Sequence, residues 1–174
     1  MSIPPPFEAV ATRPAELWAE VRARDQVMRY RRSGMGATSV LVCVSSGDAL
    51  WPELLEALSM HARVIVPELP ADGDIARWLG DFLEGLGLCE VSVVAADPYC
   101  ISAVQLVLLD ADQVTRLLLV PVSGGTEAET EGTLGTAASN PPVPLLLIRR
   151  EQPAEVALPL VLRFLGVGDT AALP

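Results

Sequence analysis

The sequence contains no lysine among its 174 residues, and all twelve of its permanently basic side chains are arginines. Twenty-two carboxylates oppose them, so the formal net charge is -10 at pH 7. A chain with this charge repels a phosphate backbone and an anionic lipid surface. We therefore expect neither nucleic acid nor a membrane as a partner.

Histidine is almost as scarce, since His61 is the only one in the chain. The three cysteines, Cys43, Cys89 and Cys100, are an odd number without C-x-x-C spacing, which indicates neither a disulfide framework nor a zinc site. The sequence also lacks Walker A, G-x-G-x-x-G and EF-hand patterns. We expect no metal and no cofactor.

Long apolar runs are missing too, because no stretch approaches eighteen consecutive apolar residues. The first ten residues carry prolines and a glutamate where a signal peptide needs a basic start, so we expect a cytoplasmic protein. The apolar fraction of 51% is nevertheless high beside 20% charged residues. This excess favours a partner that covers part of the surface.

What the sequence does contain is an alternation of short apolar runs and amphipathic segments. The apolar runs predict strands at Ser39–Val44, Arg63–Val66, Val91–Val94, Arg116–Val120 and Pro144–Ile148. Helical spacing predicts helices at Pro14–Arg24, Trp51–Met60, Ile75–Leu86, Ile101–Leu109 and Ala157–Leu165. An edge strand is expected at Met28–Gly34. This order predicts an α/β fold with an open, mostly parallel sheet and helices on both faces.

Between residues 30 and 120 the order of these segments resembles the α/β-hydrolase fold family. The resemblance is carried by YRRSGMG, SVLVCVSSG, WPELLEAL, RVIVPELPADGD, WLGDFLEGLGL, VSVVAADPYC and VTRLLLV, followed by PVPLLLIRREQP. It implies a single domain over residues 1–174, with residues 1–27 as a lead-in and a helix. The acidic, small-residue stretch 123–140 would be a flexible loop in place of the cap domain of many relatives.

The family's chemistry uses a nucleophile on a strained strand-to-helix elbow, G-x-S-x-G, together with an acid and a late histidine. The matching segment here is Ala-Ala-Asp-Pro-Tyr, which places Asp97 at the serine position. Some relatives, such as haloalkane dehalogenases and epoxide hydrolases, use an aspartate nucleophile. Pro98, however, has no N–H to donate to an oxyanion hole, and Tyr99 replaces a glycine.

The proton-transfer partners of the family are missing as well. His61 comes too early in the chain, and we expect it on the opposite rim of the sheet from the elbow. Glu151 and Gln152 stand near the position of the family's acid, but the chain offers no imidazole for either of them to orient. The resemblance therefore implies a small, capless member of the fold without a Ser/His/Asp triad.

Six residues are candidates for a ligand site at this elbow: Ser45, Ser46, Gly47, Asp97, Tyr99 and Cys100. Asp97 would bind a ligand or act catalytically, or it would only cap the following helix. Cys100 would gain thiolate character from the helix dipole, or it would serve as packing. The turn at Ser45–Gly47 would bind an anion or simply end its strand, and Tyr99 would line the cleft or fill it.

Outside the elbow, Arg29, Arg31 and Arg32 form the one basic cluster of an acidic chain. Edge strands often carry charges that prevent pairing with other sheets, and such a role fits the predicted edge strand. The alternative is that the arginines bind an acidic partner.

Two functions fit these observations. The first is a non-catalytic binding or partner subunit, which would pack on its own copy or on an active homologous subunit. The alternative is a cofactor-free cyclase, isomerase or decarboxylase, in which Asp97 acts as general acid or base on a small hydrophobic ligand, assisted by Ser46 or Tyr99. Ester hydrolysis by a triad is not expected.

Overall fold

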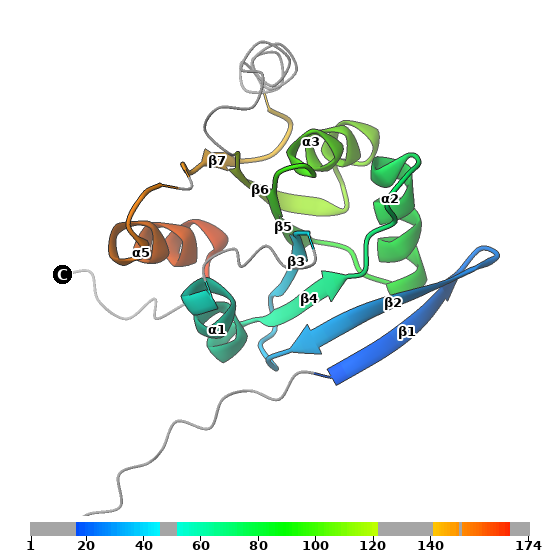
Figure 1. The fold of residues 1–174 in the computed structure, drawn as a ribbon, viewed down its shortest axis with the longest axis horizontal. Coiled ribbons are helices and arrows are strands. Elements are labelled where there is room, and N and C mark those ends of the chain that lie inside the picture. The colour runs from blue at the N-terminus through cyan, green and yellow to red at the C-terminus, as the bar shows by residue number, and fades with distance from the viewer. Residues whose placement is uncertain (1–16, 46–51, 122–140, 150, 168–174) are drawn as a thin grey trace, which may run out of the picture.

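A computed structural model describes residues 17–45, 52–121, 141–149 and 151–167. Within these ranges the chain forms a seven-stranded sheet in the order β1-β2-β4-β3-β5-β6-β7, flanked by helices on both faces (Figure 1). The pairings β1–β2 and β2–β4 are antiparallel, and all the other pairings are parallel. The predicted open, mostly parallel α/β sheet is confirmed.

The elements agree with most of the predicted segments. The strands are β1 (Leu17–Ala23), β2 (Gln26–Ser33), β3 (Ser39–Cys43), β4 (Arg63–Pro67), β5 (Val91–Ala96), β6 (Val114–Val120) and β7 (Leu145–Leu147). The helices are α1 (Pro52–His61), α2 (Ile75–Leu86), α3 (Cys100–Leu109) and α5 (Ala154–Leu165). The predicted lead-in before residue 17 and the predicted acidic loop 123–140 lie outside the described residues.

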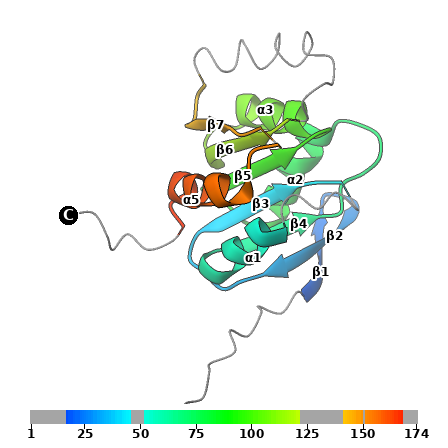
Figure 2. The same ribbon diagram turned by 60° about the vertical axis from the view of Figure 1, so that its left-hand side comes forward.

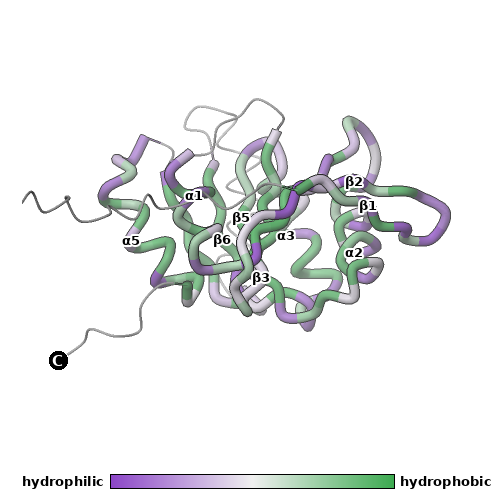
Figure 3. Tube along the Cα trace, turned by 90° about the horizontal axis from the view of Figure 1, so that it is seen from below, coloured by the Kyte–Doolittle hydropathy of each residue, from purple (hydrophilic) through white to green (hydrophobic). Residues whose placement is uncertain are grey.

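Apolar side chains fill both faces of the sheet. One core cluster joins the strands to α2 and α3, and a second joins them to α1 and α5, which lie on the opposite face (Figure 2). Every residue of β3 and β5 is buried, which is why these strands appear in the sequence as continuous apolar runs without alternation. Hydrophilic residues gather instead at the tip of the β1–β2 hairpin (Figure 3).

The ends of α2 show why its prediction was accurate. Asp74 precedes the helix, and its side chain accepts a hydrogen bond from the Arg77 N–H at 3.0 Å. Gly87 follows the helix with φ of 63°, a left-handed conformation that glycine adopts without a steric penalty, and its N–H bonds to the last turn. Both boundaries are set by local residues that the sequence displays.

The predicted helix at Pro14–Arg24 is wrong in the part that the structure describes, since Leu17–Ala23 is strand β1. The segment alternates with period two: Ala19, Val21 and Ala23 pack toward α2, while Trp18 and its alternating neighbours point to the other face. Leu17, Trp18 and Val21 fit one face of a helix, but the alternation of Ala19, Val21 and Ala23 fits a half-buried strand equally well. The predicted helix within residues 1–27 is corrected accordingly.

The identification of β2 as an edge strand is also wrong. β2 pairs with β1 on one side and with β4 on the other. The edge position belongs to β1, which sequence reasoning did not find. The arginines of β2 therefore do not lie on the exposed edge that they were expected to protect.

A close contact holds the β1–β2 hairpin against α2. A Cβ added at Gly85 of α2 would lie 2.8 Å from the Ala23 Cβ and 3.2 Å from a methyl group of Val21. The ion pair of Arg24 and Asp81, at 2.8 Å, ties the hairpin tip to the same helix. Gly85 thus permits the distance at which the hairpin docks.

None of the helices in the described part of the chain is long and apolar enough to span a membrane.

We expect Gly85→Ala and Gly80→Ala, two identical changes in one helix, to act in opposite directions. Gly80→Ala places its Cβ 3.8 Å from Leu106, so better helix propensity should stabilise the protein by about 0.5–1 kcal/mol. Gly85→Ala forces β1 away from α2 and should cost about 1–3 kcal/mol through overpacking. Urea unfolding measures both values, and equal stabilisation by the two variants would contradict the tight contact.

Candidate functional site

The carboxyl ends of β3 and β5 lie side by side because these strands pair in parallel, with Cys43 opposite Ala95. Ser45 follows β3 and Asp97 follows β5, so both residues stand at the carboxyl edge of the sheet. Open α/β sheets bind their ligands at this edge. Both residues are half-buried. Two further candidates, Ser46 and Gly47, lie outside the described residues.

Asp97 does not cap α3, so the cap interpretation is wrong. The helix begins at Cys100, Tyr99 occupies its N-cap position, and the Tyr99 side chain makes no capping hydrogen bond. The Asp97–Pro98 peptide bond is cis, and the Tyr99 N–H donates to the Ala96 carbonyl at 2.8 Å. Three residues, Asp97, Pro98 and Tyr99, therefore separate β5 from α3, whereas an N-cap residue directly precedes its helix.

The strained backbone of a nucleophile elbow is also missing at Asp97. Among the described residues other than glycine, only Arg24 and Glu90 have positive φ angles. Asp97 is therefore held in an ordinary backbone conformation. The turn does not present the Asp97 side chain as the family's elbow presents its nucleophile.

The backbone amides near Asp97 offer no family-type oxyanion hole. Pro98 follows Asp97 and lacks an N–H. The next amide, at Tyr99, is already bonded to the Ala96 carbonyl within the turn. Loss of one such donor typically costs an enzyme about 3 kcal/mol of transition-state stabilisation.

The Cys100 thiol interacts with the Asp97 carboxyl. Burial, and after it the charge and a hydrogen bond of Asp97, raises the pKa of Cys100 to about 12. The Cys100 Sγ also donates to the Ala95 carbonyl at 3.5 Å. Of the two alternatives for Cys100, its burial and raised pKa favour packing over a thiolate, because desolvation outweighs the helix dipole.

A second buried thiol, Cys43, lies at the end of β3 beside this group. Burial raises the pKa of Cys43 to about 12, and Cys43 is close enough to contribute to the raised pKa of Cys100. Both thiols are therefore protonated at neutral pH. The sequence identified Cys43 only as a buried apolar residue, and no local signal placed it next to Cys100.

The only histidine is far from this edge. His61 is the last residue of α1 and is exposed. Because α1 returns the chain to the start of β4, its end lies at the amino edge of the parallel strands. The six-residue β5 spans about 20 Å between the two edges. The predicted placement of His61 on the rim opposite Asp97 is confirmed.

Of the remaining candidates, Tyr99 contributes to packing, and Glu151 and Gln152 follow β7. Tyr99 is half-buried and packs against the α2–α3 core cluster. Glu151 follows β7 and is exposed, and Gln152 bonds through its N–H to the Arg149 carbonyl at 3.0 Å. Within the described ranges no three His, Cys, Asp or Glu side chains are grouped to hold a metal ion.

Comparison with known proteins identifies the fold but not the family. No protein-family model matches the sequence, and no curated protein matches it either. Solved structures do match. A serine hydrolase involved in carbazole degradation aligns with a TM-score of 0.55 and 20% identity, covering 72% of this chain and 56% of that protein.

Two other solved structures give a similar result. Carboxylesterase CesB from Bacillus subtilis aligns with a TM-score of 0.50 and 18% identity, covering 61% of this chain and 43% of that protein. Epoxide hydrolase VrEH1 from Vigna radiata aligns with a TM-score of 0.52 and 17% identity, covering 63% and 41%. The chain has the α/β-hydrolase fold, and it spans about half the length, or less, of these enzymes.

We expect one of the three thiols to react quickly with a disulfide reagent at pH 8 in the native protein. Cys89 is exposed, whereas Cys43 and Cys100 are buried, with pKa values raised to about 12. Absorbance of the released thiolate should show one fast equivalent, and three after unfolding in urea. Cys89→Ser should abolish the fast phase, and a fast phase that persists in this variant would contradict the burial of the other two.

Proposed function

We propose that this protein is a catalytically inactive member of the α/β-hydrolase fold that acts as a binding or partner subunit. One observation carries the proposal: the only imidazole in the chain lies at the opposite edge of the sheet from Asp97. An ester-cleaving site of this fold needs a base within hydrogen-bond reach of its nucleophile. A group at the far edge cannot supply it.

The turn after β5 supports the same proposal independently. The residue that should donate an N–H is Pro98, and the following amide is bonded within the turn. An acyl-transfer intermediate would therefore gain little stabilisation here. The structural neighbours named above are hydrolases by name, but the present chain matches only part of each. A shared fold does not by itself establish a shared activity.

Exposed apolar side chains support the binding half of the proposal. Large hydrophobic residues that are about half or more exposed occur on β1, β2, α1, α3, β7 and α5, and between β2 and β3. They are Leu17, Trp18, Val27, Met35, Met60, Leu108, Leu109, Leu147, Val156 and Leu160. A protein partner that covers some of them would remove apolar surface from water. The partner would be a second copy, an active homologous subunit or another protein.

A second candidate function is a cofactor-free enzyme that uses Asp97. It is favoured by the position of the half-buried Asp97 carboxyl, which stands at the ligand-binding edge beside the Cys100 thiol. Proton transfer within a small hydrophobic ligand needs only one positioned acid or base, without a triad. If Asp97→Asn left the turnover of such a ligand unchanged, this alternative would be dismissed.

We expect the purified protein to hydrolyse p-nitrophenyl butyrate no faster than Asp97→Asn and His61→Gln variants do, and without saturation. The reason is that Pro98 has no N–H to donate, the Tyr99 amide is bonded within the turn, and the only histidine, His61, lies at the opposite edge of the sheet. Release of p-nitrophenolate measures the rate, and an active carboxylesterase serves as the positive control. Saturable hydrolysis that is lost in Asp97→Asn would refute the proposal of an inactive protein.

The proposed role as a binding or partner subunit is tested by measuring the molar mass in solution. Light scattering coupled to size-exclusion chromatography should show self-association at micromolar concentration, or a complex with the product of a neighbouring gene after co-expression. A strict monomer that binds none of the co-expressed proteins would contradict a partner subunit.

A further inference from the structure

The face of the β1–β2 hairpin opposite α2 carries an unusual set of side chains, which we call the Trp18 platform. Three cross-strand pairs form it: Trp18 with Arg31, Glu20 with Arg29, and Arg22 with Val27. The alternate residues of both strands pack under α2. Ser33, at the end of β2, bonds to Ser59 of α1 at 2.7 Å, so α1 meets the hairpin at this end.

Two guanidinium groups lie over the indole ring at the centre of the platform. The Cζ atoms of Arg29 and Arg31 are 5.1 and 5.8 Å from the ring centroid of Trp18. Both distances fall within cation–π range. Trp18 nevertheless remains 59% exposed, and Val27 remains 54% exposed. The platform is thus an ordered arrangement of aromatic and cationic groups that water still reaches.

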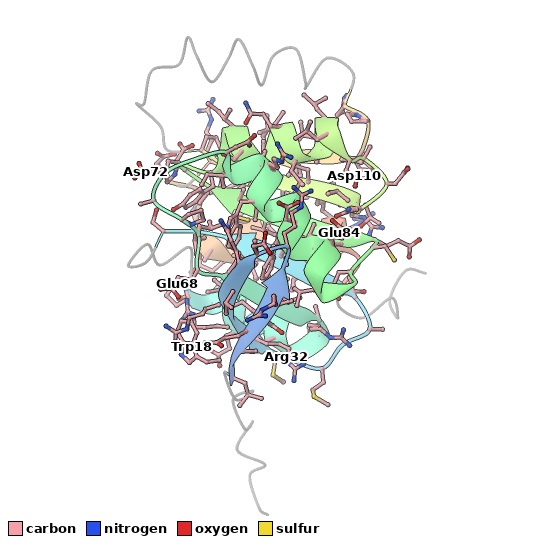
Figure 4. The ribbon with its side chains drawn as sticks, turned by 90° about the vertical axis from the view of Figure 1, so that its right-hand side faces the viewer. Trp18, Arg32, Glu68, Asp72, Glu84 and Asp110 are labelled. Atoms are coloured by element: carbon pink, nitrogen blue, oxygen red, sulfur yellow. The ribbon has the colours of Figure 1, made fainter. Side chains whose placement is uncertain are left out.

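The protection of a sheet edge does not account for these arginines. β2 is hydrogen-bonded on both sides, to β1 and to β4. Arg29 and Arg31 share the platform face, whereas Arg32 alternates with them and belongs to the other face. Figure 4 shows Trp18 and Glu68 on one side of the hairpin and Arg32 on the other. The basic cluster of the sequence is therefore divided, and two of its members are gathered around Trp18.

Two carboxylates approach Arg29, but loosely. Arg29 lies 3.6 Å from a Glu20 oxygen and 3.8 Å from a Glu68 oxygen, and all three side chains are more than half exposed. Both distances exceed ordinary hydrogen-bond length, and exposed ion pairs of this kind contribute little to stability. A carboxylate with better geometry can therefore replace them.

We propose that the Trp18 platform is the docking surface for an acidic segment of a partner protein. Carboxylates of that segment pair with Arg29 and Arg31, and an adjacent apolar side chain packs on Trp18 and Val27. Tryptophan and arginine are the residue types that most often dominate binding energy at protein interfaces. Stacking on the indole also orders the two guanidinium groups before the partner arrives. This inference rests on the proposed function, to which it adds the position of the binding surface and the chemistry of the partner.

Charge favours a short segment over a second whole copy as the occupant. A second copy brings ten further net negative charges, whereas a segment brings only those that contact the platform. At physiological salt the screening length is about 8 Å, so a docked segment mainly senses the arginines beside it. The remaining acidity of the chain then opposes nonspecific association with other acidic surfaces.

The probe for this proposal is a fluorescein-labelled peptide with three repeats of Glu-Glu-Leu, titrated with the whole chain and followed by anisotropy. We expect Arg31→Glu and Trp18→Ala each to weaken binding about tenfold or more, and Trp18→Phe to retain most of the affinity. Arg163→Glu is the matched control, because it makes the same charge change at an exposed site on α5. Urea midpoints of all variants test whether the hairpin stays folded.

Three results would overturn the proposal. The first is no binding of the peptide at 50 mM NaCl, and the second is equal weakening by Arg31→Glu and Arg163→Glu. The third is tighter, Trp18-dependent binding of a single-stranded oligonucleotide of equal charge, which would assign the platform to nucleic acid. None of these three results bears on the proposed lack of catalysis, because the ester assay tests that. Conversely, ester turnover would not affect the proposal of peptide binding.

Discussion

The burial of β3 and β5 on both faces is the constraint from which the rest of this structure follows. Strands that are buried on both faces need helices on each side of the sheet. Parallel strands need crossover connections that return the chain to the same edge. Every loop that follows a strand therefore collects at one edge of the sheet, and every loop that follows a helix collects at the other. This rule brings Asp97 to one edge and assigns His61, at the end of α1, to the opposite edge.

The same rule separates what maintains the fold from what sets the chemistry of the turn after β5. Packing of the two core clusters depends mainly on aliphatic side chains along the strands and helices. Replacement of a single turn residue leaves the clusters intact. A proline after Asp97 and a thiol held protonated beside it alter the chemistry of the turn after β5, yet the parallel pairing of β5 with β3 and β6 continues around it.

Sequence reasoning succeeded where a local signal decided the structure. The bounds of α2 were predicted to the residue because Asp74 and Gly87 mark its ends, and the core strands were found because short, β-branched apolar runs between turns are typical of buried strands. It failed at Leu17–Ala23, because this short segment fits both a helical pattern and a strand pattern. Pairing with β2 makes it a strand. It failed again at Asp97, because the length of the turn before Cys100 depends on how β5 and α3 pack. The proximity of Cys43 to Cys100, and that of Trp18 to two arginines, arise from strand pairing and have no signature within one segment.

The antiparallel hairpin also has a protective consequence for the parallel strands. β4 is the outermost parallel strand on this side, and it would be an edge strand if β2 were not bonded along it; an unprotected edge strand readily recruits another chain. A version of the protein shortened to begin after Ser33 would expose the backbone of Arg63–Pro67 to its own copies. Such a truncated protein is expected to polymerise through β4 rather than simply to lose solubility.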